Sequence, residues 1–184
     1  MTTQLTAGTK ERHGVITEAG TIVFERLLPG PIERVWDYLT DSEKRGKWLA
    51  TGPLDQKPGG KIELFFRNGD LSPVKEPTPE RFKGMEKGVT LRCEVTECRK
   101  PNLLSFLWGD DGSEVTFELE MQGKDVLLRL THRRLPSRAM ALNVAGGWHT
   151  HLGILIDHLG GKATRPFWSN FLSVYEEYEA RIPG

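Results

Sequence analysis

Histidine is the side chain in this sequence with the widest chemistry, since it acts as an acid, a base or a metal ligand near neutral pH. His149 and His151 are two positions apart, so on a helix they point about 200° from each other. His151 and His158 share a helix face but are about 10 Å apart along its axis, too far for one ion. The sequence has no C-x-x-C pair or carboxylate cluster to add ligands. We therefore expect neither a metal ion nor another cofactor.

His132 is better placed for chemistry in a pocket. In the segment DVLLRLTHRR it has the same parity as Leu128 and Leu130, so a strand there would point it inward with them. The usual role of such a histidine is a buried, hydrogen-bonded one, and the alternative is a polar contact or a general base. His151 leaves the same two alternatives open. The sequence has no GxSxG, GxGxxG or Walker motif, so it indicates no nucleophile and no nucleotide site.

A long helix near the C-terminus would position His151. One apolar face recurs at helical spacing over residues 141–161, and it consists of Trp148, Leu152, Leu155 and Leu159. The pair Gly146-Gly147 predicts a kink or a close approach to another backbone, because glycine is a poor helix former. The pair Gly160-Gly161 is typical of a helix end. A second helical pattern follows Pro166.

The segments before this helix alternate as strands do, with turn residues between them. The expected strands span residues 21–28, 61–67, 89–99, 103–108, 114–121 and 125–134. Between the first two, Pro31 suits the start of a helix, and Asp41 or Ser42 can cap a short second one. This layout predicts an α+β fold, in which a curved antiparallel sheet wraps around the long C-terminal helix. Two short helices follow the first strand, and a gap between sheet and long helix would form an apolar cavity.

Residues 68–88 show neither the spacing of a helix nor the alternation of a strand. The segment holds Pro73, Pro77 and Pro79 among mixed charges, and it is long for a loop in a compact domain. The simpler interpretation is a surface excursion. The other is a lid over a pocket, which long loops sometimes form.

Composition limits the classes of function. Lys and Arg number 25 and so do Asp and Glu, a balance that argues against a nucleic-acid partner. No apolar run approaches the roughly 18 residues of a membrane span, and the N-terminal residues lack the apolar stretch of a secretory signal. We expect a cytoplasmic protein, with a disordered lead at residues 1–20 and a single domain over 21–184.

The order of elements and four phrases carry a resemblance to a known family. The phrases are FERLLPGPIERVWDYLTDSEKRGKWL, PNLLSFLWG, VTFELEMQGKDVLLRLTHRRLP and GGWHTHLGILIDHL. Together they resemble the START-like helix-grip (SRPBCC) superfamily, and within it the bacterial proteins related to the activator of heat-shock-protein ATPase. The resemblance covers roughly residues 21–182, and VWDYLTD with Trp48 and the GGW of the last helix are its most specific parts. It implies the helix-grip fold but no single function, because the superfamily includes carriers, cyclases and co-chaperones.

The resemblance also implies where a ligand cavity would lie, with tryptophans in its wall. The candidate lining residues are Trp48, Leu64, Phe66, Trp108, Phe117, His132, Trp148, His151 and Leu155. We favour binding of a hydrophobic small molecule, such as a lipid or an aromatic metabolite, because this needs only a cavity and no catalytic motif. The alternatives are a co-chaperone that stimulates a heat-shock chaperone ATPase, and a cyclase- or hydrolase-like enzyme that uses His132 or His151. A homodimer through an edge strand or the second C-terminal helix is also open.

Overall fold

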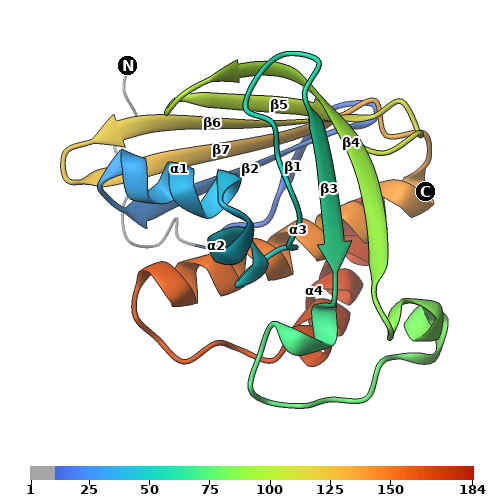
Figure 1. The fold of residues 1–184 in the computed structure, drawn as a ribbon. Helices are drawn as coiled ribbons and strands as arrows, with labels where there is room; N and C mark the ends of the chain where they lie inside the picture. The colour runs from blue at the N-terminus through green and yellow to red at the C-terminus, as the bar shows by residue number, and fades with distance from the viewer. Residues whose placement is uncertain (1–10) are drawn as a thin grey trace.

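The computed structural model describes residues 11–184, which form one curved sheet with helices on its inner side (Figure 1). The strands are β1 Val15–Glu18, β2 Thr21–Pro29, β3 Lys61–Phe66, β4 Val89–Arg99, β5 Leu103–Leu107, β6 Glu114–Gln122 and β7 Asp125–Arg133. The helices are α1 Ile32–Thr40, α2 Ser42–Gly46, α3 Arg138–Leu159 and α4 Phe167–Arg181, with short 3-10 segments η2 Asn68–Asp70 and η3 Glu80–Met85.

The strands pair antiparallel in the order β1-β2-β7-β6-β5-β4-β3. Figure 1 shows the sheet curving over α3, with α1 and α2 on one side and α4 below, behind β3 and β4. Helix α4 packs on α3. The sheet therefore has a buried inner face and a solvent-exposed outer face, as antiparallel sheets commonly do. The predicted α+β helix-grip fold is confirmed.

The two short helices after β2 form as predicted. Helix α1 buries one apolar face, made of Ile32, Val35, Trp36 and Leu39. The side chain of Asp41 accepts the backbone N–H of Lys44 and so caps α2. Arg45 is buried, and its guanidinium donates to the carbonyl oxygens of Thr40 and Ala50 at 3.1 Å each. These bonds fix the chain that leads from α2 to β3.

Helix α3 begins earlier than predicted because Ser137 accepts the N–H of Met140 and caps it. Its predicted apolar face is buried as expected, at Trp148, Leu152, Leu155 and Leu159. The predicted close approach to another backbone is wrong, and the helix is continuous through Gly146 and Gly147. A Cβ on Gly146 would lie 3.1 Å from the ring of Phe171, whereas one on Gly147 would meet nothing within 4 Å. Gly146 thus faces a packed side chain, and Gly147 faces open space.

The expected disordered lead over residues 1–20 needs correction in its second half, while residues 1–10 lie outside the described part. Residues 15–18 form β1, in which Val15 and Ile16 pair with Val23 and Ile22 of β2. All four side chains of β1 are exposed. The strand therefore has no buried face to mark it in the sequence, and backbone pairing with β2 supplies its order.

Candidate ligand-binding site

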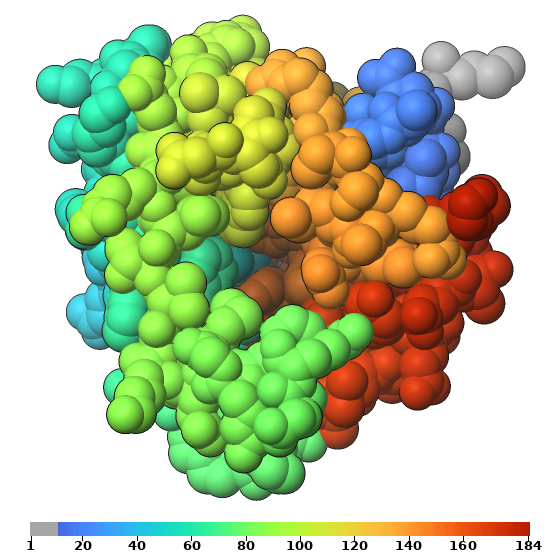
Figure 2. Space-filling model, turned by 90° about the vertical axis from the view of Figure 1, so that its right-hand side faces the viewer, coloured from blue at the N-terminus to red at the C-terminus, as the bar shows by residue number. Residues whose placement is uncertain are grey.

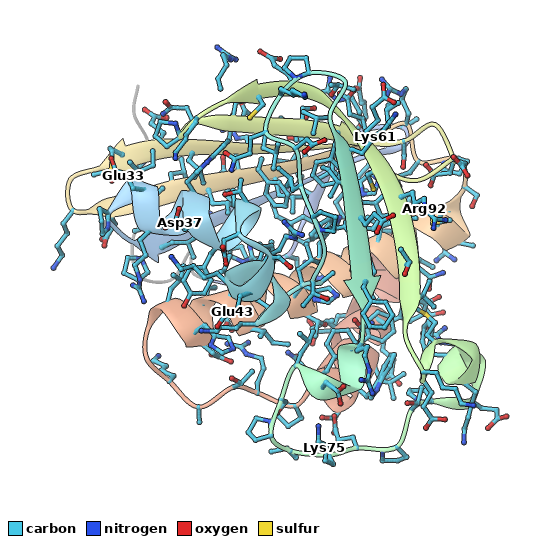
Figure 3. The ribbon with its side chains drawn as sticks, in the orientation of Figure 1. Glu33, Asp37, Glu43, Lys61, Lys75 and Arg92 are labelled. Carbon is cyan, nitrogen blue, oxygen red and sulfur yellow. The ribbon has the colours of Figure 1, made fainter. Side chains whose placement is uncertain are left out.

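A cavity of about 400 Å³ lies where the sheet and α3 separate, enclosed by β3, β4, η3 and α4. Figure 2 shows a hollow at the centre of this face, between the green η3–β4 segment, the orange start of α3 and the red α4. Seven of the 17 residues that line it are Phe or Trp: Phe66, Phe82, Trp108, Trp148, Phe167, Trp168 and Phe171. Among the described residues, no Asp, Glu, Lys or Arg lines it. The charged side chains labelled in Figure 3 lie on the outside of the fold.

The nine predicted lining residues divide into three groups. Those that reach this cavity are Phe66, Trp108, Trp148 and His151. Those that surround a separate void of about 10 Å³ near α2 are Trp48, Leu64 and Phe117. The two that lie fully buried in the core, with an exposed fraction of 0 %, are His132 and Leu155. A void of 10 Å³ holds at most about one water molecule, so only the first group belongs to the large cavity.

Other segments complete the wall, and sequence reasoning missed them. They contribute Leu49 after α2, Asn68 from η2, Phe82 and Met85 from η3, Val89 and Leu91 from β4, Met140, Asn143, Val144 and Gly147 from α3, and Phe167, Trp168 and Phe171 from α4. The segment 68–88 thus forms one side of the cavity with three residues, while much of it is exposed, and its role as a lid stays a prediction. The helix α4 was predicted, and the signal that could have indicated its part in the wall is its start, where Phe167, Trp168 and Phe171 place three aromatic rings within five residues. Packing of α4 on α3 alone would not need three aromatic rings so close together.

Segment η3 contacts α4 through aromatic stacking and a cation–π contact between side chains. The Phe82 ring stacks on Trp168 at 5.3 Å between centroids and meets Phe171 edge-on at 5.2 Å. The guanidinium of Arg81 lies 4.1 Å from the ring centroid of Tyr175. Such contacts are individually weak. The same loop also bonds to the start of α4, where Glu76 accepts the backbone N–H of Ser169 at 3.2 Å.

His132 fixes the indole of Trp148 against the cavity. The indole Nε1–H donates to Nδ1 of His132 at 3.1 Å, so the ring proton of His132 is on Nε2. That Nε2–H lies 2.8 Å from Oγ of Ser113, whose hydroxyl donates to Asp111 at 2.6 Å. Burial lowers the pKa of His132 to about 4, which keeps it neutral at pH 7. Both ring nitrogens are occupied, so this histidine positions Trp148 and has no free atom with which to act as a base.

His151 is the histidine that lines the cavity. Its Nδ1–H donates to the carbonyl oxygen of Trp48 at 2.7 Å, which leaves Nε2 as a hydrogen-bond acceptor. The ring packs against Phe167 at 5.0 Å and Phe66 at 6.2 Å between centroids. Burial lowers the pKa of His151 to about 4. A general base works best with a pKa near the working pH, so the environment of His151 suits hydrogen bonding better than proton transfer.

Within residues 11–184, no group of three His, Cys, Asp or Glu side chains is placed to hold a metal ion. No described helix combines the length and the apolar character needed to cross a membrane.

Comparison with known families gives the same picture as the fold. A family model described as activator of Hsp90 ATPase homolog 1-like protein matches residues 29–160. The chain belongs to this family. The resemblance drawn from the sequence phrases is thereby confirmed, and the matched segment of this family runs from the end of β2 to the end of α3.

Solved structures agree with the family assignment. A protein of Bordetella parapertussis, determined by solution NMR, is 43% identical, with a TM-score of 0.79 over 94% of this chain and 91% of that one. CalU16 of Micromonospora echinospora is 20% identical, with a TM-score of 0.61 over 87% and 86% of the two chains. DynU16, from the dynemicin biosynthetic locus, is 20% identical, with a TM-score of 0.60 over 81% of this chain and 51% of that one. The last two show a shared fold only. Among curated proteins, none matches this chain.

Proposed function

We propose that this protein binds an apolar small molecule in the cavity between the sheet, α3 and α4. The cavity itself carries the proposal, because its volume of about 400 Å³ lies within the range of roughly 300–1,000 Å³ typical of ligand sites. Protein interiors pack about as densely as organic crystals and leave few voids larger than a water molecule. An aromatic wall without charged side chains suits an apolar occupant.

The histidines support binding rather than catalysis. His132 has both ring nitrogens bonded to protein groups, at 3.1 and 2.8 Å. The lowered pKa of His151 leaves it neutral, and it can accept a hydrogen bond from a ligand. A ligand can enter through the hollow seen in Figure 2, which the η3 segment borders with Phe82 and Met85.

Uptake of N-phenylnaphthylamine, an uncharged dye that fluoresces in apolar surroundings, tests the proposal. We expect saturable uptake by the native protein and by Ala139→Leu, which adds the same side chain at an exposed position of α3. Gly147→Leu should lose uptake, because the added side chain enters the cavity. Native mass spectrometry of protein from its own cells should show a bound apolar molecule. If the native protein binds neither dye nor cell-derived ligand, the proposal is wrong.

The family match raises a chaperone partner as a second candidate, because the family is described by activation of the Hsp90 ATPase. Measuring the ATPase rate of Hsp90 from the same source, with and without this protein, tests it. Stimulation that survives in Gly147→Leu would assign the activity to a surface, whereas stimulation lost in that variant would couple it to the cavity. Light scattering of the same preparation tests the predicted homodimer.

A further inference from the structure

The turn between β5 and β6 is connected to the wall of the cavity by a chain of hydrogen bonds. Asp111 is exposed on this turn, and its Oδ1 accepts the hydroxyl hydrogen of Ser113 at 2.6 Å. Oγ of Ser113 lies 2.8 Å from Nε2 of His132, whose Nδ1 accepts the indole N–H of Trp148 at 3.1 Å. Trp148 lines the cavity. Three bonds therefore lead from an exposed carboxylate to the cavity wall.

The two ends of this chain fix the direction of every bond in it. An ionised carboxylate only accepts, so the hydroxyl of Ser113 must donate to Asp111. An indole N–H only donates, so Nδ1 of His132 carries no hydrogen. The remaining bond then runs from Nε2–H of His132 to Oγ of Ser113. One tautomer of His132 satisfies both ends.

Without the carboxylate of Asp111, nothing in the chain fixes that tautomer. The hydroxyl of Ser113 is then free to donate to Nε2 of His132, which moves the ring hydrogen to Nδ1. Nδ1–H would face Nε1–H of Trp148, and these two donors have no acceptor between them. Both rings are buried, with exposed fractions of 0 % for His132 and 3 % for Trp148. A buried donor without an acceptor is costly, so the indole would leave its position.

The same turn holds a second tryptophan of the cavity wall. The backbone N–H of Trp108 donates to the carbonyl oxygen of Ser113 at 2.9 Å. The rings of Trp108 and Trp148 lie 5.3 Å apart between centroids, and both line the cavity. Ser113 is fully buried, and its own backbone N–H donates to Oδ1 of Asp111 at 2.8 Å. The turn therefore sets the place of two aromatic rings of the wall.

We infer that Asp111 and Ser113 are positioning residues for the cavity, because they fix the tautomer of His132 and through it the place of the Trp148 indole. A network in which every buried group is paired holds its side chains in one arrangement. Neither Asp111 nor Ser113 lines the cavity itself. This inference rests on the proposed function and names residues on which the affinity for a ligand depends.

Binding of N-phenylnaphthylamine to single variants tests the inference. Asp111→Ala removes the acceptor, whereas Ser113→Ala removes the hydroxyl and keeps the backbone N–H that bonds to Asp111. We expect both variants to bind the dye about three- to tenfold more weakly than the native protein, as loss of one buried neutral hydrogen bond gives. Asp110→Ala is the matched control, since it removes a carboxylate from the same turn but outside the chain, and it should bind the dye as the native protein does.

NMR reads the tautomer directly, which a loosened turn alone would not change. In the native protein at pH 7, long-range ¹H–¹⁵N spectra should place the ring hydrogen of His132 on Nε2. Asp111→Ala should move part of it to Nδ1 and shift the Nε1–H resonance of Trp148. Asp111→Asn keeps an acceptor oxygen, so it should return the hydrogen to Nε2.

The outcomes separate this inference from the proposed function. Native affinity in both Asp111→Ala and Ser113→Ala, equal weakening in Asp110→Ala, or a hydrogen on Nδ1 of His132 in the native protein would overturn the positioning role while the binding function stands. In case the variants fail to fold, hydrogen exchange of the native protein decides. The dye should slow exchange of the Trp148 indole N–H, and an unchanged rate would overturn the role. A native protein that takes up no dye would overturn the proposed function, and the inference with it.

Discussion

Two adjacent glycines of α3 allow the packing described above to be tested by one matched pair of substitutions. Gly147→Ala replaces a glycine inside a helix, where the gain in helix propensity is about 0.8–1.0 kcal/mol. The new Cβ meets nothing within 4 Å, so no packing penalty opposes this gain. For a chain of 184 residues, 1 kcal/mol corresponds to roughly 2–4 °C in Tm. We expect Gly147→Ala to raise Tm by that amount.

Gly146→Ala brings the same gain in propensity but a different contact. Its Cβ would lie 3.1 Å from Cε2 of Phe171, whose ring is itself packed against Phe82 at 5.2 Å and Trp168 at 6.1 Å. Overpacking of this kind costs about 1–3 kcal/mol, which cancels or exceeds the gain. We expect a Tm equal to or below that of the native protein, and thus a clear difference between the two variants.

Thermal unfolding of the native protein and both variants, checked by urea unfolding at 25 °C, measures this difference. Equal effects of Gly146→Ala and Gly147→Ala would mean that the helix responds to propensity alone. A lower Tm for Gly147→Ala than for Gly146→Ala would refute the reasoning, because it would place a wall where the structure has a cavity.

Two further predictions concern acid stability and the η3 segment. Burial lowers the pKa of His132 and His151 to about 4 and of His149 to about 3, so between those values and about pH 6.5 the unfolded chain binds more protons. The free energy of unfolding is then highest above about pH 6.5 and falls as the pH drops, by up to about 1.4 kcal/mol per pH unit for each histidine. Urea unfolding midpoints that coincide at pH 7 and pH 5 would contradict this. Arg81→Ala should cost about 0.5–1 kcal/mol and speed release of the dye in stopped-flow experiments, whereas Lys83→Ala, on the same segment, should release it at the native rate.

Most of the fold could be predicted from the sequence because each large element has a buried face with its own period. Residues at helical spacing on α3 and alternating residues on β6 and β7 are buried together. The same reasoning missed β1, which has no buried face. It also predicted a kink or a close backbone approach at Gly146 and Gly147, because the sequence shows that glycine is a poor helix former but not which atoms lie next to it.

The candidate site was predicted less well, for a physical reason. Parity along a strand indicates that Leu64, Phe66 and Phe117 all face inward, and all three are buried. Parity does not indicate whether other side chains fill the space in front of them. The space that stays open depends on how α4 and η3 are placed against the sheet. Contacts between those two elements, such as Phe82 on Trp168, set that placement. Phe66 therefore lines the large cavity, while Leu64, two residues earlier, lies in the packed core.

Two of the residues that line this cavity have features that lower the stability of the fold. Gly147 lies inside a helix without the positive φ that would require glycine, and it faces open space. Trp168 buries a donor that no described group accepts. Each lowers the stability of the chain, because glycine is a poor helix former and a buried donor without an acceptor is unfavourable. Such departures are expected where function, not stability, decides the residue. An occupant of the cavity explains Gly147, because it needs the space in front of that residue.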